Sequence, residues 1–234
     1  GIIAAQMIAA GKIMNIILPG HYRLFIILCA LIFISYTVFG GQTSVINADI
    51  FQSFLIFTGV VTAVVSAWLK HGHLESALLP AGYLDFPFNE KLGHHEIIMF
   101  FMFVGTSYIA GPDMYSRILS SKDKKSASKS VFVAAFIIAV LSIMIVSIGL
   151  YAKMVAPDIE PESSFQFLIM NTIPSGFQGV VFTALLAAFL STAATCLLTS
   201  SIILTNDVLN PVFFGNRLDD GIKLVITQPM VIIY

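Results

Sequence analysis

Residues 131–150, VFVAAFIIAVLSIMIVSIGL, form a run without a charged side chain. A helix needs about 20 predominantly apolar residues to cross the roughly 30 Å hydrocarbon core of a bilayer, and this run has that length. Residues 50–69 and 176–205 are also free of charge. None of these runs shows the alternation expected of strands in a membrane barrel. The sequence therefore predicts an all-α fold of membrane-spanning helices.

The composition supports an integral membrane protein. Hydrophobic residues make up 57% of the chain and charged residues 11%, and the mean hydropathy is +0.91. Soluble domains contain roughly 45–50% apolar and about 25% charged residues. We expect a multi-pass protein of the plasma membrane, embedded in a lipid bilayer and without a nucleic-acid partner.

Apolar runs of bilayer length predict a polytopic transmembrane helix bundle that forms a single transmembrane domain over residues 1–234. Its expected spans are 1–18, 23–40, 48–69, 96–119, 130–152, 176–206 and 222–234. The first and last of these spans are incomplete. We therefore expect the chain to be a fragment that lacks both ends of a longer protein.

The densest basic cluster predicts the orientation. The segment 120–129 contains Lys122, Lys124, Lys125 and Lys129. Basic residues are enriched in the short cytoplasmic loops of membrane proteins, so we expect this loop to be cytoplasmic. Alternation then places residues 70–95 and 153–175 outside, and the loops 41–47 and 207–221 inside.

The segment TALLAAFLSTAATCLLTSS, residues 183–201, carries a stripe of small and hydroxyl-bearing side chains. At 100° per residue, the members of the stripe fall within an arc of about 100°. They are Ala184, Ala188, Ser191, Thr192, Thr195 and Thr199. One interpretation is close helix packing, because small residues let backbones approach and hydroxyls can bond to a carbonyl of the preceding turn.

The other interpretation of the stripe is a cation site. Ser191 and Thr192 are adjacent hydroxyls, and the carbonyl of Ala188 lies one turn earlier, so three neutral oxygens converge. Neutral oxygens can hold an alkali cation weakly enough to release it. Such a site would need further oxygens from another helix.

A second polar region, FMFVGTSYIAGPDMYSRIL at residues 101–119, contains Thr106 and Ser107 followed by Gly111 and Pro112. Proline lacks an N–H donor and disturbs the preceding turn, so we expect the helix to kink or break here. Broken helices at membrane depth mark the binding sites of many transporters. The alternative is that Gly-Pro-Asp is only a turn at the cytoplasmic boundary.

Asp49 opens the expected span 48–69. A carboxylate at this position can act as a helix cap that faces the helix dipole. It can also raise the local cation concentration at a cytoplasmic vestibule.

The histidines of the expected outer loop do not form a recognised metal motif. They are His71, His73, His94 and His95, the last followed by Glu96. They lack the i, i+4 spacing of a zinc-protease helix, so we expect solvated loop residues and no metal other than sodium. The sequence contains neither a nucleotide-binding glycine loop nor a nucleophile elbow, so we expect no enzymatic activity and no catalytic residue.

Three segments together resemble the sodium:solute symporter family, which includes sodium/proline, sodium/pantothenate and sodium/sugar transporters. YTVFGGQTSVINADIFQ is similar to the family's tyrosine, double-glycine and Asp…Gln segment. GPDMYSRILSSKDKKSA resembles its arginine-bearing stretch with a lysine-rich loop. TALLAAFLSTAATCLLTSSIILTNDVLNP resembles its sodium-binding helix. The order and spacing of these segments match over roughly residues 1–210.

The resemblance implies a partial leucine-transporter-like inverted-repeat core with an interrupted helix. By position, it implies that the Ala188 carbonyl and the hydroxyls of Ser191 and Thr192 bind sodium, the coupling ion. Asp49 would lie on the ion's release route to the cytoplasm.

The resemblance also assigns roles outside the ion site. Thr106, Ser107 and Tyr108 would border the substrate cavity. Arg117 and Asp207 would have structural roles at the inner face.

The resulting hypothesis is a secondary active transporter that couples sodium entry to uptake of a small polar or anionic solute by alternating access. The sequence leaves two alternatives open. One is a membrane-embedded solute-sensing domain of a larger signalling protein, and the other is a structural membrane subunit that transports nothing.

Overall fold

The computed structural model describes residues 1–74, 79, 93–119, 121–159, 163–219, 221–223 and 226–227, except for the side chains of residues 39–44, 113, 116 and 117. Every regular element within these ranges is helical, which confirms the predicted fold class. The expected span 222–234 lies mostly outside the described residues.

The chain divides into two compact units. The first unit comprises Gly1–Gly59 and Gly179–Tyr234, and the second comprises Val60–Gln178. The long helices α2 (Tyr22–His71) and α7 (Ser175–Ile203) contribute residues to both units.

Helix α1 (Ile2–Ile17) packs with part of α2 and α7 in the core of the first unit. At Gly11, an added Cβ would lie 2.5 Å from Cγ1 of Ile26, so glycine permits a close approach of α1 to α2. The core combines small and large apolar side chains from three helices, which are Ala10, Cys29, Phe33 and Ala193 with Met7, Met14, Leu186, Phe189 and Leu190 packed against them.

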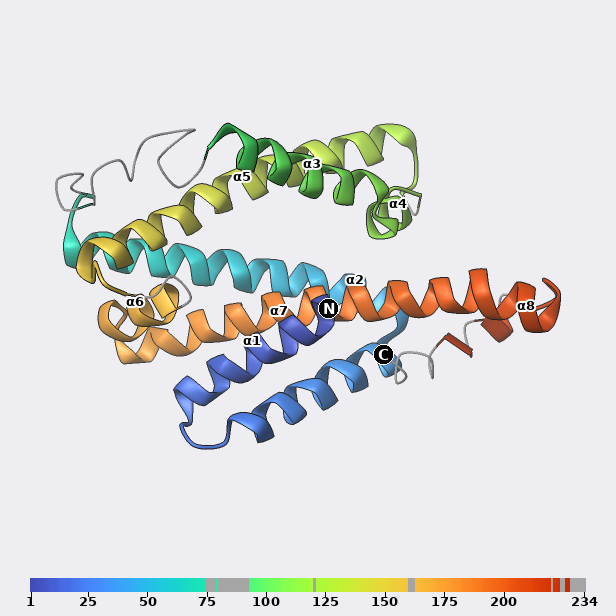
Figure 1. The fold of residues 1–234 in the computed structure, drawn as a ribbon, viewed down its shortest axis with the longest axis horizontal. Coiled ribbons are helices and arrows are strands. Elements are labelled where there is room, and N and C mark those ends of the chain that lie inside the picture. The colour runs from blue at the N-terminus through green and yellow to red at the C-terminus, as the bar shows by residue number, and fades with distance from the viewer. Residues whose placement is uncertain are drawn as a thin grey trace. The chain divides into compact units, whose positions relative to one another are not determined.

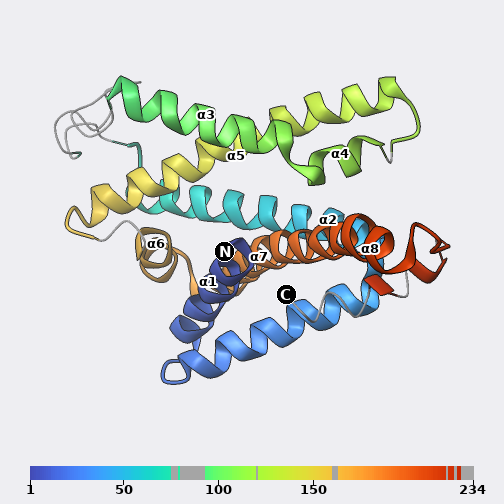
Figure 2. The same ribbon diagram turned by 45° about the vertical axis from the view of Figure 1, so that its right-hand side comes forward.

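Helix α2 contains two of the expected spans. Its apolar arms are Tyr22–Val38, the first arm, and Val45–His71, the second arm. The backbone between them is also helical, so residues 41–47 are not the non-helical connection that was expected between the two spans. A straight helix of 50 residues would be about 75 Å long, far longer than a bilayer core. Figures 1 and 2 show that the ribbon instead turns back between the arms.

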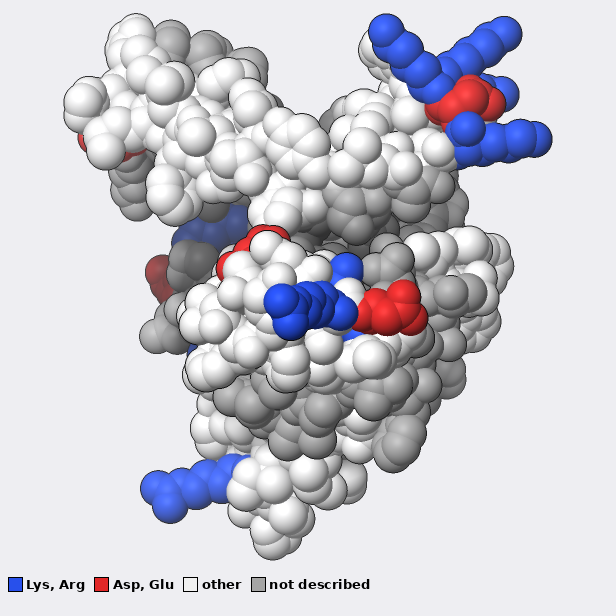
Figure 3. Space-filling view, turned by 90° about the vertical axis from the view of Figure 1, so that its right-hand side faces the viewer, with Lys and Arg blue, Asp and Glu red and all other residues white. Residues whose placement is uncertain are grey.

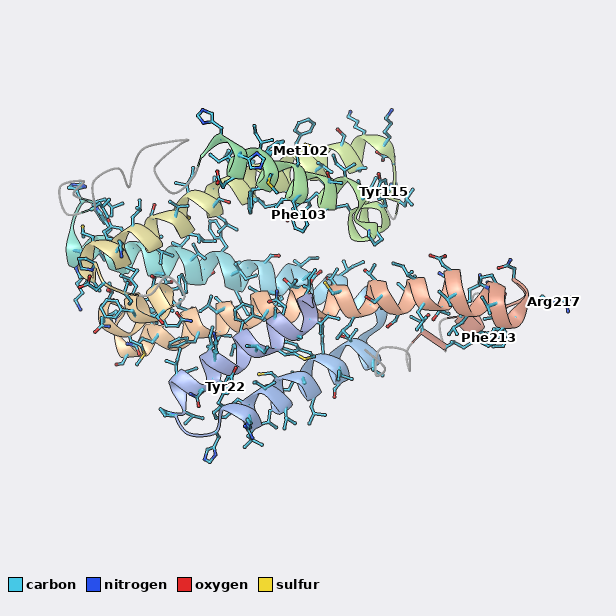
Figure 4. All side chains as sticks on the ribbon, viewed as in Figure 1. Tyr22, Met102, Phe103, Tyr115, Phe213 and Arg217 are labelled. Atoms are coloured by element: carbon cyan, nitrogen blue, oxygen red, sulfur yellow. The ribbon has the colours of Figure 1, made fainter. Side chains whose placement is uncertain are left out.

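Helix α7 also continues further than expected. It leads into the π-helix η3 (Leu204–Leu209) and then α8 (Asn210–Phe214). The expected loop 207–221 therefore begins only at Gly215, whose positive φ of 55° ends α8. Phe213 and Arg217 mark this end of the first unit (Figure 4).

The second unit contains the interrupted helix that the sequence predicts. Helix α3 (His94–Ala110) stops before Gly111, and α4 (Pro112–Leu119) begins after it. Gly111 has φ −67° and ψ 123°, because a residue before proline is disfavoured in the helical conformation. The expected break in 96–119 is therefore confirmed.

Helices α5 (Lys124–Val155) and α6 (Ser164–Thr172) complete the second unit, and both depart from expectation. The side chain of Asp123 accepts a 2.7 Å hydrogen bond from the backbone N–H of Ser126, which caps α5 and makes most of the expected loop 120–129 helical. Figure 3 shows several basic side chains around an acidic patch in the upper right corner of the view. Helix α6 lies in the expected loop 153–175, where no helix was predicted.

Among the residues that the structure describes, three helical stretches are long and apolar enough to cross a membrane: Val45–His71, Lys124–Val155 and Ser175–Phe214. Helix α3 is also strongly apolar, and none of its residues is buried within the structure. Met102 and Phe103 are 63% and 76% exposed and stand out from α3 (Figure 4). A helix with apolar side chains on all sides is typical of a hydrophobic environment.

Polar contacts fasten the end of α2 within the second unit. The hydroxyl of Tyr151 donates a 2.9 Å hydrogen bond to the carbonyl of Gly72. Lys70 Nζ donates to the carbonyl of Asn171, and His71 Nε2 lies 3.2 Å from the hydroxyl of Thr172. The expectation that His71 is a solvated loop residue was therefore wrong, because it ends α2 and has a partner on α6.

Candidate cation site

A buried carboxylate joins α2 to α7 in the first unit. Asp49, on the second arm of α2, is only 9% exposed. The hydroxyl of Ser191 on α7 donates a 2.7 Å hydrogen bond to its Oδ1. A buried charge is costly unless polar groups surround it, and the Ser191 hydroxyl supplies one such group. At Ser191, the stripe on α7 therefore faces a carboxylate oxygen of α2 and not hydrocarbon.

The other two expected ligands lie within one turn of Ser191. The hydroxyl of Thr192 donates a 3.0 Å hydrogen bond to the carbonyl of Ala188. Ala188 is half-buried, while Thr192 is exposed in the structure. The structure thus gathers Ala188, Ser191, Thr192 and Asp49 in one region of the first unit.

Further along the stripe, the two helices pack closely. A Cβ added to Gly59 on α2 would lie 2.3 Å from Cβ of Ala184 and 3.5 Å from Cα of Val181. Small residues permit such an approach between helix backbones. Ala184 thus fits the interpretation of the stripe as a close-packing surface, whereas Ser191 makes a polar contact with the neighbouring helix.

The sequence interpretation gave no role to Gln52, three residues after Asp49. Gln52 is 6% exposed, and its Oε1 has no hydrogen-bond partner among the described residues. Thr205, at the start of η3, likewise has a buried hydroxyl without a partner in the described part of the chain. The sequence signal for Gln52 was a carboxamide side chain about one turn after Asp49, in an otherwise apolar run. Sequence alone cannot show which way that side chain points.

The expected substrate residues Thr106, Ser107 and Tyr108 are consecutive on α3 in the second unit. All three are exposed, and Tyr108 is 65% exposed. The hydroxyl of Ser107 donates a 2.8 Å hydrogen bond to the carbonyl of Phe103, one turn earlier. Their role at a substrate cavity remains a prediction.

The two expected structural residues lie in different units. Arg117 belongs to α4 of the second unit, and its side chain lies outside the described part of the structure. Asp207 lies in η3 of the first unit and is exposed. Their roles at the inner face also remain predictions.

The histidines form no metal centre within the described ranges, where no group of three or more His, Cys, Asp or Glu residues could hold a metal ion. His94 and His95 begin α3 and are not loop residues. The ring of His73 lies edge-on to Trp68, with 6.3 Å between ring centroids.

The helical fold and the polar contacts between two apolar helices are those of a membrane protein with a polar site inside its bundle. The sequence model of the Sodium:solute symporter family matches residues 1–217. The chain therefore belongs to the sodium:solute symporter family, as its three motifs predicted. Membership and the apolar helices together indicate an integral membrane protein.

Relatives with assigned functions are distant in sequence. A sodium/proline symporter of Staphylococcus aureus is 27% identical over 210 residues, covering 86% of this chain and 40% of the relative. A sodium/pantothenate symporter of Escherichia coli strain K12 is 24% identical, covering 89% of this chain and 44% of the relative. A sodium/glucose cotransporter of Vibrio parahaemolyticus is also 24% identical, with coverages of 76% and 39%. The chain thus spans less than half the length of these relatives.

A solved structure shares the fold. It is the substrate-bound, outward-open state of a Na⁺-coupled sialic acid symporter, with a TM-score of 0.85 and 17% sequence identity. The similarity covers 99% of this chain and 52% of the symporter. This similarity confirms the expected partial leucine-transporter-like architecture.

Proposed function

We propose that this chain is part of a plasma-membrane symporter that couples sodium entry to uptake of a small polar or anionic solute. In this proposal, the carbonyl of Ala188 and the hydroxyls of Ser191 and Thr192 bind sodium. Family membership supports sodium coupling, and the distant relatives named above differ too much in their solutes to identify the one carried here.

The hydrogen bond between Ser191 and Asp49 is the observation that carries the proposal. It brings a carboxylate of α2 to one of the three expected sodium ligands on α7. Negative charge next to neutral oxygens favours a cation by Coulomb attraction, which is strengthened where water is excluded. Asp49 would then receive the ion as it leaves the three α7 oxygens for the cytoplasm.

Coupling would follow because the binding of sodium and the binding of the solute are thermodynamically linked. Sodium bound at α7 would favour an outward-open cavity, and solute binding would then permit closure. Thr106, Ser107 and Tyr108 would border that cavity. At a membrane potential of about 100 mV, each entering sodium contributes about 2.3 kcal/mol before its concentration gradient is counted.

The remaining assignments concern the inner face. Segment 120–129 would lie in the cytoplasm because of its lysines. Arg117 and Asp207 would have structural roles on the same side of the membrane.

Uptake measurements on cells that express the full-length gene product test the proposal. A panel of radiolabelled small polar and anionic solutes would be offered in sodium buffer and in potassium buffer. We expect one solute class to accumulate only with sodium. We expect the double variant Ser191→Ala, Thr192→Ala to lose at least tenfold in sodium-dependent uptake at equal surface expression, because two sodium ligands are removed.

Thr183→Ala is the matched control. Thr183 also lies on α7, is exposed, and donates a 2.7 Å hydrogen bond to the carbonyl of Gly179, but it lies outside the stripe. We expect this variant to retain wild-type uptake. Equal uptake with sodium or potassium would rule out sodium coupling, and an active double variant would rule out the proposed ligands.

A further inference from the structure

Four exposed lysines gather around the start of α5. Lys122 precedes the helix, Lys124 and Lys125 are its first two residues, and Lys129 lies in the second turn. We call these four residues the lysine cluster. None of their side chains makes an ion pair or a hydrogen bond with another residue in the described part of the chain.

The position of the lysine cluster does not stabilise α5. The amino-terminal end of a helix carries a partial positive charge, so basic side chains are unfavourable there. Segment 122–129 contains four lysines and one acidic residue, Asp123, and so has a net charge of +3. The Asp123 carboxylate already accepts hydrogen bonds of 2.7 and 3.2 Å from the backbone N–H and the hydroxyl of Ser126. The surplus of positive charge therefore calls for an explanation other than the stability of the helix.

The lysine cluster continues on one face of α5 into exposed apolar side chains. At 100° per residue, Lys125 and Lys129 share an arc of about 60° with residues 132, 136 and 143. These residues are Phe132, Phe136 and Ile143, which are 74%, 71% and 69% exposed. Hydrocarbon is the environment that suits such a row of large apolar side chains. This face therefore changes from basic to apolar along the helix axis, as expected where a helix passes from lipid headgroups into lipid tails.

The length of α5 places the lysines at the depth of the headgroups. Its 32 residues span about 48 Å, which exceeds the roughly 30 Å hydrocarbon core of a bilayer. With the charge-free run 131–150 in that core, the backbones of Lys129 and Lys125 lie about 3 and 9 Å beyond its edge. The headgroup region adds roughly 5–7 Å on each side of the core. Long lysine side chains can therefore bring their ammonium groups to the level of the lipid phosphates.

Ammonium groups at this depth suit anionic lipids better than neutral ones. A lysine ammonium is a compact positive charge that binds phosphate oxygens. A phosphatidylcholine headgroup carries its own cation beside the phosphate, whereas phosphatidylglycerol keeps a net negative charge. Clusters of about four or more basic residues next to a membrane span attract anionic lipids through this charge.

We propose that the lysine cluster is a binding surface for the headgroups of anionic phospholipids, whose acyl chains lie along the exposed apolar face that begins at Phe132. Charge complementarity at the depth of the phosphates selects this occupant, and the apolar face continues the same surface into the hydrocarbon. The inference goes beyond the proposed function. It depends neither on sodium coupling nor on which leaflet the surface meets.

Thermal unfolding of the purified full-length protein tests this inference. The protein would be held in a neutral detergent with potassium chloride, and phosphatidylglycerol or phosphatidylcholine would be added over the same range of lipid concentration. A ligand that binds only the folded state raises Tm as its concentration increases. We expect half-maximal stabilisation of the wild type at a phosphatidylglycerol concentration about tenfold below that of phosphatidylcholine.

Two variants of the lysine cluster separate charge from side-chain length. In the first, all four lysines are replaced by glutamine, and we expect the two lipids to act at concentrations within about twofold of each other. In the matched control, the same four lysines are replaced by arginine, which keeps the charge, and we expect the preference for phosphatidylglycerol to remain. The substitutions in the first variant are Lys122→Gln, Lys124→Gln, Lys125→Gln and Lys129→Gln.

Two further conditions test the nature of the partner. Raising potassium chloride from about 50 to about 500 mM should weaken the preference of the wild type, because salt shortens the range over which charges attract. Inorganic phosphate at the same concentration as the lipid should not raise Tm, because it has no acyl chain to lie along the apolar face.

Several outcomes would overturn the proposal. They are equal action of the two lipids on the wild type, an unchanged preference in the glutamine variant, and loss of the preference in the arginine variant. Stabilisation by inorganic phosphate to the same extent would assign the cluster to a soluble anion instead. Failure of the glutamine variant to fold would also contradict the proposal, because exposed side chains without a partner in the described part of the chain should be replaceable without loss of the fold.

Discussion

The hydroxyl of Ser191 lies 2.7 Å from Oδ1 of Asp49, although 142 positions separate the two residues in the sequence. This hydrogen bond joins the second arm of α2 to α7 in the first unit. The carboxylate is buried, so bulk water screens its negative charge only weakly at the expected cation ligands.

The charge of Asp49 gives a first prediction. Asp49→Asn keeps an oxygen that can accept the Ser191 hydroxyl but removes the negative charge. We therefore expect the variant to fold and to require about tenfold more sodium for half-maximal uptake, which corresponds to about 1.4 kcal/mol. Uptake against sodium concentration at equal surface expression is the measurement. An unchanged sodium requirement would show that the carboxylate acts only in packing.

The close approach at Gly59 gives a second prediction. A methyl group there would meet Cβ of Ala184 at 2.3 Å, so we expect Gly59→Ala to lower the free energy of unfolding by about 1–3 kcal/mol through overpacking. The double variant Gly59→Ala, Ala184→Gly should recover most of this loss, because it removes the atom that clashes.

Gly149→Ala on α5 is the control for this pair. An added Cβ at Gly149 meets nothing within 4 Å, so the exchange should leave stability unchanged or raise it by up to about 1 kcal/mol. Thermal or denaturant unfolding in detergent gives the comparison. Lack of recovery in the double variant would show that the clash does not involve Ala184.

The hydroxyl of Tyr151 gives a third prediction, within the second unit. This side chain is 4% exposed and donates to the carbonyl of Gly72, at the end of α2. Tyr151→Phe leaves that hydrogen bond unmade, so we expect a loss of about 1 kcal/mol in the free energy of unfolding. Tyr115→Phe on α4, where the side chain is 52% exposed, should have a smaller effect. Equal losses in the two variants would contradict the assigned hydrogen bond.

The cap of α5 gives a fourth prediction, which concerns pH. The backbone N–H of Ser126, followed by its hydroxyl, holds the pKa of the Asp123 carboxyl below its ordinary value. A carboxyl with a lowered folded-state pKa stabilises the fold above its unfolded pKa, and this contribution disappears as pH falls through the folded-state pKa. The first turn of α5 should therefore fray under acid conditions.

Amide hydrogen exchange in residues 124–127, corrected for the intrinsic effect of pH, measures this fraying. Asp123→Asn retains an oxygen that can cap the helix but does not ionise in this range. We expect the wild type to lose protection on acidification, whereas the variant should change little. Parallel loss of protection in both proteins would assign the effect to another group.

The sequence predicted the features that depend on local chemistry. Charge-free runs predicted the apolar helices, and Pro112 predicted the break after Ala110 because a proline and its preceding residue cannot continue a regular helix. The expected spans were less accurate at their ends. Lysine is a good helix former, so charge at Lys124 and Lys125 limited the apolar run but not helix α5.

The candidate site was predictable only in part. The hydroxyl stripe on α7 follows from helical periodicity, but its pairing with α2 is a tertiary contact between distant segments. Helical periodicity could place Gln52 on the same side of α2 as Asp49, but it could not show that the Gln52 side chain is buried. The short helix α6 was missed because its nine residues are too few for an apolar span.

The hydrogen bond from Ser191 also determines what the Ser191 hydroxyl oxygen can still bind. A hydroxyl group has one hydrogen and two lone pairs, and here the hydrogen is committed to Asp49. Thr192 is held in the same way, since its hydrogen points to the carbonyl of Ala188. Any species that reaches these two oxygens therefore meets only lone pairs, so the site repels anions and hydrogen-bond acceptors and admits cations and donors.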